Sequence, residues 1–280
     1  MRKLVAALAV RNNGKRLYGK PLQNLDENTK VIDYLISTIN FFLEIEEIVM
    51  GISEGNENIF YKDYCNKKNI KYIFGNERDV LGRLIHCGDL TGATDIFRVS
   101  TESPFIWMEE FTSIWKSHLL NENDITVTDN LPEGTTFEIY TLKALKLIHD
   151  IGGEEYRSEV FSRYPRNNAK DFKVEVFHPP KELQRTDIRL TIDNPEDLAL
   201  CREVFKRLIE DHDNIKIEKI IELLDNDKAL KNLVEHHIDT KQTLMWNNFL
   251  KKIKMKKKSF KNSIKFHKKT QRLKRFLLKA

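Results

Sequence analysis

Two consecutive stretches of sequence decide the fold class: Lys3-Leu-Val-Ala-Ala-Leu-Ala-Val10 and Arg11-Asn-Asn-Gly-Lys-Arg-Leu-Tyr-Gly-Lys20. After its initial lysine, the first stretch is a continuous apolar run, which is typical of a strand buried on both faces of a parallel sheet. A secretory signal would continue into a cleavage site, whereas this run is followed at once by a polar, basic loop. We therefore interpret residues 3–10 as the first buried strand.

Strand-like and helix-like segments alternate through the first 130 residues. Apolar runs predict strands at 3–10, 46–53, 70–74, 94–100 and 124–129. Helical spacing of apolar residues predicts helices at 31–43, 56–68, 79–90 and 108–120. Strands that alternate with helices form a mostly parallel sheet with helices on both faces and right-handed crossovers. The expected fold class is therefore α/β.

The rest of the chain is less regular. Further strands are predicted at 137–141, 172–177 and 188–193, and further helices at 141–150 and 154–164. Asn194 and Pro195, with acidic residues directly after them, predict the start of another helix. We expect a main domain at 1–210, a helical extension at 211–250 packed on it, and a basic tail at 251–280.

The charge distribution separates this tail from the rest of the chain. Residues 251–280 hold 14 of the 47 Lys and Arg residues and no acid, which leaves 33 basic and 42 acidic residues in 1–250. Apolar residues interrupt the basic run at spacings that fit a partly amphipathic helix on an anionic membrane. A disordered, solvated tail is the alternative, and nucleic acid or protein is a less favoured partner.

Composition indicates a soluble globular protein. Hydrophobic residues make up 40% and charged residues 32% of the chain, and no apolar run approaches the roughly 20 residues that span a bilayer. The three cysteines are far apart and form no CxxC pair, which argues against a disulfide framework and a zinc knuckle. We expect a cytoplasmic protein, peripheral to the membrane if the tail binds there.

The loop at 11–20 is the first candidate for a functional site. Ligands of open parallel sheets bind at the carboxyl ends of the strands, which is where this loop begins. Its four cations and two glycines suit a triphosphate, because glycines let backbone N–H groups approach phosphates and the cations neutralise them. A solvated basic turn is the alternative. The loop matches neither the Walker A spacing nor GxGxxG.

Six segments resemble, in the same order, the motifs of one enzyme family. They are residues 11–22, 74–83 (FGNERDVLGR), 97–105 (FRVSTESPF), 132–138 (PEGTTFE), 157–159 (RSE) and 189–198 (RLTIDNPEDL). The chain resembles the cytidylyltransferases that include CMP-sialic-acid synthetases, CMP-Kdo synthetases and spore-coat polysaccharide cytidylyltransferase-like proteins. The likeness covers about residues 3–210.

This resemblance implies a Rossmann-like sheet of the nucleotide-diphospho-sugar transferase type and a Mg²⁺-dependent reaction. In that reaction a nucleophile on the acceptor attacks the α-phosphorus of CTP, CMP is transferred and pyrophosphate leaves. The implied acceptor is a sugar acid or a related acidic precursor of a surface polysaccharide or glycan. The implied assembly is a homodimer.

The resemblance also implies roles for individual residues. The residues implied to bind the nucleotide are Arg11, Gly14, Arg16, Gly19, Lys20, Arg78 and Arg83. Those implied in catalysis are Arg11, Lys20, Glu102 and Asp193. Glu102 and Asp193 are also the implied magnesium ligands, because one or two carboxylates plus phosphate oxygens are the usual protein site for this ion.

Both predicted metal ligands have an alternative interpretation. Asp193 could cap the helix that follows it, although Asn194 could fill that role. Glu102 could be a solvated loop carboxylate. Asp79 is predicted to cap the helix at 80–90 rather than to contact the substrate.

The acceptor side is less well defined. Arg98 emerges from a buried strand, so its charge requires an ion pair or a substrate contact. The residues implied to bind the acceptor, or to complete a dimer, are Arg98, Glu138, Arg157 and Glu159.

Three residues depart from the family pattern: Gly14 stands for the usual Ser, Tyr18 for Pro and Glu102 for Asp. They indicate a diverged acceptor or lost activity, so a catalytically lapsed binding protein is one alternative function. A glycosyltransferase of the related fold is the other. Such an enzyme normally carries Asp-x-Asp after a central strand, and here this motif occurs only at 211–213 and 225–227, in late helical segments.

Overall fold

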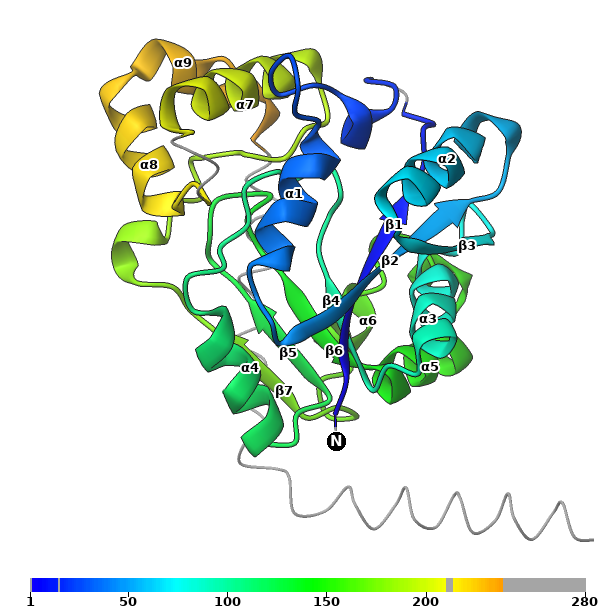
Figure 1. The fold of residues 1–280 in the computed structure, drawn as a ribbon. Helices are drawn as coiled ribbons and strands as arrows, with labels where there is room; N and C mark the ends of the chain where they lie inside the picture. The colour runs from blue at the N-terminus through cyan, green and yellow to red at the C-terminus, as the bar shows by residue number, and fades with distance from the viewer. Residues whose placement is uncertain (1, 15, 210–213, 239–280) are drawn as a thin grey trace, which may run out of the picture.

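A seven-stranded sheet forms the centre of the computed structural model, which describes residues 2–14, 16–209 and 214–238 (Figure 1). The strands are β1 Leu4–Val10, β2 Ile45–Ser53, β3 Lys71–Gly75, β4 Asp95–Arg98, β5 Ile125–Thr128, β6 Glu138–Thr141 and β7 Val174–Phe177. Their order in the sheet is β3-β2-β1-β4-β6-β5-β7. Strand β6 runs antiparallel to β4 and β5, while β2, β3, β4 and β7 pair with their other neighbours in parallel. The predicted mostly parallel α/β sheet is confirmed.

Strand β1 shows why its sequence is apolar throughout. It pairs with β2 on one side and with β4 on the other. Its side chains alternate between two cores: Leu4, Ala6 and Leu8 lie in one, Val5 and Ala7 in the other. Successive side chains of a strand point to opposite faces of the sheet. A central strand covered on both faces therefore has no position for a polar side chain.

Helices cover both faces of the sheet (Figure 1). They are α1 Val31–Asn40, α2 Ile59–Lys68, α3 Val80–Thr91, α4 Phe111–Leu120 and α5 Leu142–Ile151. Helices α3 and α5 contribute to one core, and α1, α2 and α4 contribute to the core on the opposite face. The helices predicted in this part of the chain are thus confirmed. Asp79 is the N-cap of α3, where its side chain accepts a hydrogen bond from the Gly82 N–H, as predicted.

The prediction of a helix at 154–164 is wrong. The structure has a 3-10 turn, Glu154–Tyr156, followed by turns and by the short helix α6, Arg163–Asn167. Between them the carbonyl of Arg157 accepts a hydrogen bond from the N–H of Leu81, at 2.9 Å. This bond joins the segment to α3 and uses a carbonyl that a helix would pair within itself. The apolar spacing instead reflects the burial of Phe161.

The prediction of a strand at 188–193 is also wrong. This segment makes a single bridge, between Glu133 and Arg189, and joins no strand of the sheet. Its N–H groups at Leu190 and Ile192 donate to the carbonyls of Glu133 and Glu102 instead. The alternating apolar residues are buried, so the pattern correctly indicated extended buried backbone. Its hydrogen-bond partners are loops, and no ladder forms.

The helix predicted at Asn194 is confirmed. Helix α7, Pro195–Leu208, begins with a capping box in which Asn194 and Asp197 bond to each other's backbone N–H groups. Helices α8 Ile217–Asn226 and α9 Lys228–Asn232 follow, and their buried apolar residues belong to the same core as α1 and α7. The tail at 251–280 lies outside the described residues. Within the part of the chain that the structure describes, no helix is long and apolar enough to cross a membrane.

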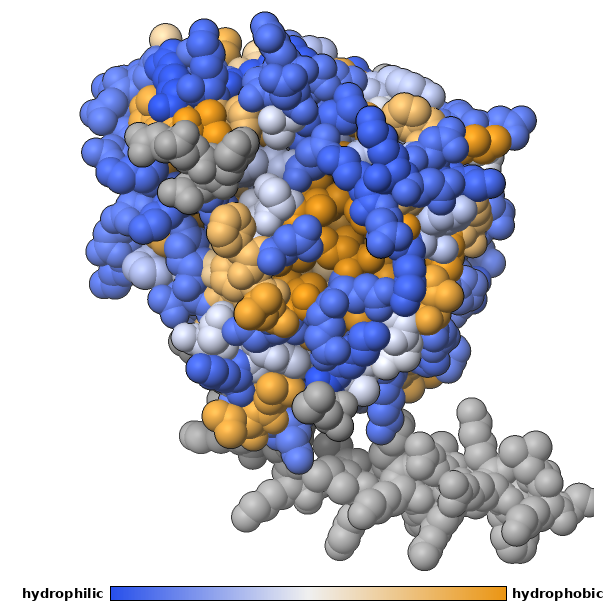
Figure 2. All heavy atoms as spheres, in the orientation of Figure 1, coloured by the Kyte–Doolittle hydropathy of each residue, from blue (hydrophilic) through white to orange (hydrophobic). Residues whose placement is uncertain are grey.

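The surface over α1 and α2 is hollowed. A hollow of about 630 Å³ lies between these helices and is lined by residues of β2 and β3 as well. Figure 2 shows apolar surface in the space between the two helices, bordered by hydrophilic residues. None of the motif residues quoted above lines it.

Candidate active site

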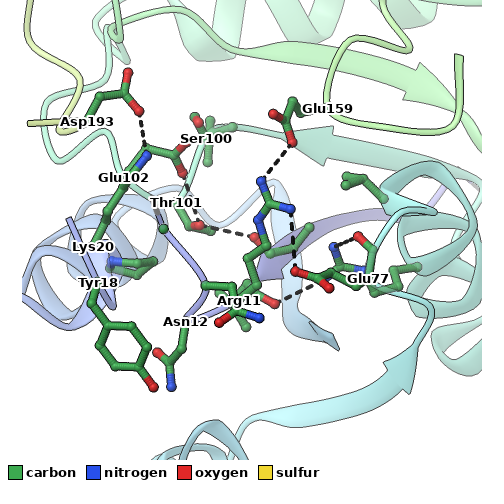
Figure 3. Close-up of a pocket in the computed structure, with 18 of the residues that line it drawn as sticks. Arg11, Asn12, Tyr18, Lys20, Glu77, Ser100, Thr101, Glu102, Glu159 and Asp193 are labelled. Carbon is green, nitrogen blue, oxygen red and sulfur yellow. Dashed lines mark hydrogen bonds and ion pairs between the residues drawn. The ribbon is translucent and has the colours of Figure 1, made fainter. Parts of the chain in front are cut away.

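A second cavity, of about 590 Å³, opens at the carboxyl ends of β1 and β4. This is the edge at which parallel sheets of this kind bind ligands. The predicted site residues that line it are Arg11, Gly14, Arg16, Lys20, Arg83, Arg98, Glu102, Glu159 and Asp193. Those that do not line it are Gly19, Arg78, Glu138 and Arg157. Segments far apart in the sequence therefore meet here, and Figure 3 shows cations of the loop after β1 facing carboxylates from other segments.

The loop after β1 folds back on itself. The Gly19 N–H donates to the carbonyl of Asn12 at 3.0 Å, and Asn12 is held in turn by the side chain of Asn58, at 2.8 Å. Gly19 has φ +56°, a left-handed conformation that favours glycine. A Cβ at Gly14 would lie 2.0 Å from the carbonyl oxygen of Leu17. Glycine in place of the family's usual serine thus fits this loop, which closes too tightly for a side chain.

Lys20 and Asp193 form a short ionic contact on the wall of the cavity. The Lys20 ammonium donates to Oδ1 of Asp193 at 2.5 Å, and Nη2 of Arg16 lies 3.4 Å from the same oxygen. The other carboxylate oxygen, Oδ2, accepts a hydrogen bond from Arg189. Burial opposes ionisation of Asp193, but Lys20 and Arg189 outweigh it and lower its pKa. Asn194 is the N-cap of α7, so the side chain of Asp193 is not used for capping.

Glu102 lies beside Asp193. The Ile192 N–H donates to the Glu102 carbonyl at 3.0 Å, which fixes the segment before α7 against the segment after β4. The hydroxyl of Thr101 donates to the carbonyl of Ala9 at 3.1 Å and ties the same segment to β1. Figure 3 shows Glu102, Asp193 and the end of Lys20 on one side of the cavity. The two predicted metal ligands are thus brought to the same wall.

Arg11 spans the opposite side. Its guanidinium lies 3.7 Å from Oε1 of Glu77 and 3.6 Å from Oε2 of Glu159 (Figure 3). Glu77 comes from the turn before α3, and Glu159 from the turns before α6. Glu77 is not among the residues predicted from the sequence, although it lies beside Arg78 in the segment at 74–83.

Arg83 has a mainly structural environment. It is only 2% exposed, and its Nη1 donates to the carbonyls of Val10 at 2.9 Å and Gly51 at 2.8 Å. Burial, together with the positive charge of Arg11, lowers its pKa to about 10. The guanidinium therefore joins the ends of β1 and β2 beneath the cavity. Arg78, by contrast, is exposed and lies outside the lining.

Behind Arg98 lies a chain of charged groups. Nη1 of Arg98 is 3.3 Å from Oε2 of the buried Glu138, and its guanidinium lies over the ring of Phe161. Glu138 is also 3.5 Å from Arg166, which makes a two-pronged contact with Asp129 at 2.9 and 3.0 Å. Of the two alternatives predicted for Arg98, an ion pair or a substrate contact, the ion pair is present. Glu138 supports it from behind rather than lining the cavity.

Arg189 and Arg166 are two further cations near the cavity that are not among the predicted site residues. Arg189 is 5% exposed and contacts Glu133, Asp193 and Asp197. It lies in the segment 189–198, four residues before Asp193. A cation so near the predicted metal ligand in sequence was the signal that could have indicated this contact. Arg166 follows no such motif, and only the fold brings it to Asp129 and Glu138.

The cavity thus brings cations of the loop after β1 together with carboxylates from distant segments. The fold and the place of this cavity are those of an α/β protein that binds a ligand at the carboxyl edge of a mostly parallel sheet. Residues 6–253 match the family model described as Cytidylyltransferase, and the chain belongs to this family. It is therefore an enzyme of the nucleotidyltransferase class.

Two proteins are similar to this chain over most of their own length. An uncharacterised protein of Methanocaldococcus jannaschii is 28% identical over 231 residues, covering 82% of this chain and 94% of that protein. The spore coat polysaccharide biosynthesis protein SpsF of Bacillus subtilis is 24% identical over 229 residues, covering 80% and 95%.

Solved structures share the fold. A cytidylyltransferase from Leptospira borgpetersenii matches with a TM-score of 0.73 at 19% identity, over 82% of this chain and 97% of that one. CMP:2-keto-3-deoxy-manno-octonic acid synthetase, solved in complex with CTP, matches with a TM-score of 0.57 at 12% identity, over 74% and 100%.

Proposed function

We propose that this enzyme is a Mg²⁺-dependent cytidylyltransferase that moves CMP from CTP to a sugar acid, or a related glycan precursor, and releases pyrophosphate. The observation that carries the proposal is the contact of Lys20 and Arg16 with Asp193 in a cavity at the carboxyl edge of the sheet. Family membership and the CTP complex of the structurally similar synthetase support CTP as the nucleotide.

The chemistry requires a fixed triphosphate and compensation for the charge that develops on the departing pyrophosphate. Arg11, Arg16 and Lys20 come from one loop and line the cavity, so they are assigned to the phosphates. The tight turn at Gly19 positions Lys20 at the start of the 3-10 turn Lys20–Leu22. The acceptor hydroxyl attacks the α-phosphorus from the side away from pyrophosphate, and we assign that side to the wall formed by Arg98 and Glu159.

The donor set fits Mg²⁺. Within the described residues, no group of three or more His, Cys, Asp or Glu side chains is placed to hold a metal ion by itself. Two carboxylates on one wall, Glu102 and Asp193, instead match an ion that takes most of its ligands from phosphates and water. When bound, this ion would neutralise phosphate charge and stabilise the leaving group.

The wall formed by Arg98 and Glu159 indicates the chemical class of the acceptor. Arg98 presents a planar guanidinium that can bind a carboxylate through two parallel hydrogen bonds. The name of the similar Bacillus subtilis protein refers to spore coat polysaccharide biosynthesis, and that of the structurally similar synthetase to a keto-deoxy sugar acid. Both support a sugar acid or a related precursor of a surface glycan.

Pyrophosphate release tests the proposal. The purified enzyme is incubated with each of the four nucleoside triphosphates against nonulosonic acids, Kdo and simple sugar or polyol phosphates, with Mg²⁺ or with EDTA. We expect turnover with CTP, Mg²⁺ and an acidic acceptor. Turnover with UTP or GTP but not CTP would refute the cytidylyl assignment, and no turnover with any acceptor would favour a lapsed binding protein.

The Asp-x-Asp motif at 225–227, the one within the described residues, does not support the glycosyltransferase alternative. Asp225 contacts Arg185 at 2.6 Å, and the side chain of Asp227 caps α9. Neither residue lines the cavity. The other Asp-x-Asp string, at 211–213, lies outside the described residues.

We further propose a cytoplasmic homodimer that attaches to anionic membranes through residues 251–280. The 14 Lys and Arg residues of this tail support attachment, because each contributes about 1 kcal/mol near an anionic surface. Light scattering of the purified enzyme tests the dimer, and a monomeric mass would contradict it.

A further inference from the structure

The cations assigned to the triphosphate all have carboxylate partners in this structure. Lys20 and Arg16 share Oδ1 of Asp193, and Arg11 lies between Glu77 and Glu159. A phosphate that binds these cations competes with the carboxylates for them. The effect of that competition depends on what each displaced carboxylate contacts next.

Asp193 cannot simply turn away. Its Oδ2 is bonded to Arg189, which is buried and also contacts Asp197 in the first turn of α7. The Asp193 N–H donates to Asp197 at 2.9 Å, so the backbone is held as well. The carboxylate is therefore fixed, with Oδ1 directed at the loop cations.

Glu77 and Glu159 are in a different situation. Their side chains are 40% and 61% exposed, against 21% for Asp193, and their contacts with Arg11 are longer than 3.5 Å. Water can solvate them once Arg11 moves, and exposed ion pairs contribute little. Losing them costs the protein far less than leaving a half-buried carboxylate beside a polyanion.

We infer that Oδ1 of Asp193 is an exchange point that makes nucleotide binding and divalent-metal binding depend on each other. This inference rests on the proposed function. Without nucleotide, Oδ1 occupies on Lys20 and Arg16 the position of a phosphate oxygen. When the triphosphate takes these cations, Oδ1 becomes available to a divalent cation, which restores charge balance. Metal alone is disfavoured because Lys20 holds Oδ1, and nucleotide alone because Oδ1 then loses its cation partners while Oδ2 stays with Arg189.

Calorimetry of CTP binding, with excess Mg²⁺ or with EDTA, tests this coupling in three proteins: wild type, Asp193→Asn and Glu77→Gln. Asp193→Asn and Glu77→Gln each neutralise one carboxylate of the same cavity, so they are matched. CTP also binds Mg²⁺ in free solution, and this contribution is identical for all three. The coupling in the protein is therefore given by the differences between the three proteins.

For wild type and Glu77→Gln we expect Mg²⁺ to strengthen CTP binding by roughly 5- to 150-fold more than in Asp193→Asn, the usual range of coupling between two ligands. In EDTA, Asp193→Asn is expected to bind CTP more tightly than wild type, because Lys20 and Arg16 are free. Weaker metal-free binding by Asp193→Asn, or an equal effect of Mg²⁺ in all three proteins, would overturn the inference.

A second measurement does not depend on the Asp193 variant. Electron paramagnetic resonance of free Mn²⁺ reports metal binding to wild type and to Lys20→Gln, each without nucleotide. We expect Lys20→Gln, in which Oδ1 has lost its ammonium partner, to bind Mn²⁺ several-fold more tightly than wild type, within the coupling range above. Equal or weaker Mn²⁺ binding by Lys20→Gln would contradict the exchange.

The two levels of the proposal can be told apart. If no protein binds any of the four triphosphates, the proposed function fails. If wild type binds CTP and the binding shows no dependence on Asp193, only the exchange fails.

Discussion

The ammonium of Lys20 donates a hydrogen bond of 2.5 Å to Oδ1 of Asp193, across 173 residues of sequence. This contact joins the loop after β1 to the segment before α7. Loop and carboxylate are thus positioned against each other, and substitutions on either side are expected to affect nucleotide handling before they affect the fold.

Asp193→Ala is expected to lower Mg²⁺-dependent turnover by at least roughly 100-fold, the scale of removing one group that stabilises developing charge. The protein should remain folded, because Arg189 keeps Asp197 and Glu133 as partners. Pyrophosphate release and thermal unfolding measure the two effects. Asp63→Ala, on the exposed surface of α2, is the control. Near-normal turnover of Asp193→Ala would refute its assignment as a metal ligand.

Asp95 is expected to make stability depend on pH. It is buried beneath Arg2, His118 and Thr94. Burial opposes its ionisation, but the bonds from these partners outweigh it and bring its pKa below 3.8. Because the folded-state pKa is depressed, the stabilisation is present above pH 3.8 and is lost as the pH falls through the folded-state value.

Asp95→Asn should therefore lower the free energy of unfolding at neutral pH by about 1 to 3 kcal/mol, the usual effect of losing a buried hydrogen bond to a charged group. The difference from wild type should shrink at successive steps below pH 3.8. Urea denaturation measures both. A difference that stays constant with pH would show that Asp95 contributes through packing alone.

Glu138→Gln tests the acceptor wall. Glu138 holds Arg98 from behind without lining the cavity. We expect the KM of the acceptor identified by the pyrophosphate assay to rise roughly 10-fold, which corresponds to about 1.4 kcal/mol. The CTP dissociation constant should not change. Glu175→Gln, on β7 and outside the cavity lining, is the control. If CTP binding weakened as much as acceptor binding, Arg98 would instead be assigned to the nucleotide.

Deletion after Leu250 tests the tail. The full chain is expected to sediment with vesicles that contain anionic phospholipid and not with neutral vesicles, and added salt should release it. The shortened chain should stay in the supernatant and retain catalysis. Sedimentation that survives the deletion would place membrane binding elsewhere.

The parallel half of the sheet was predictable because burial on both faces leaves a simple pattern. Strand β1 is apolar at every position, and no other element type explains so short a run before a basic loop. The segments at 154–164 and 188–193 were mispredicted because apolar spacing reports burial, not hydrogen bonding. The bonds from Leu81 to Arg157 and from Ile192 to Glu102 come from distant parts of the chain, and local sequence does not encode them.

The site was predictable to the extent that motifs fix it. The loop at 11–20, Glu102 and Asp193 all lie at one cavity, but their roles stay predictions. The ion pairs could not be foreseen, because Glu77 and Glu159 approach Arg11 from separate turns and Arg166 reaches Asp129 only in the folded chain. The same holds for Arg83. Its motif predicted a nucleotide contact, whereas in the folded chain its guanidinium donates to two backbone carbonyls.

Arg189 contacts Glu133, Asp193 and Asp197 at once. That three-way contact forms only when the loop before β6, the segment before α7 and the first turn of α7 are all in place. Contacts between distant segments form late, because closing long loops costs entropy before any contact is gained. A chain that ends before residue 189 contains β1 to β4 but lacks the wall that carries Asp193. The proposed nucleotide site is therefore complete only after the second half of the domain has been synthesised and has folded onto the first.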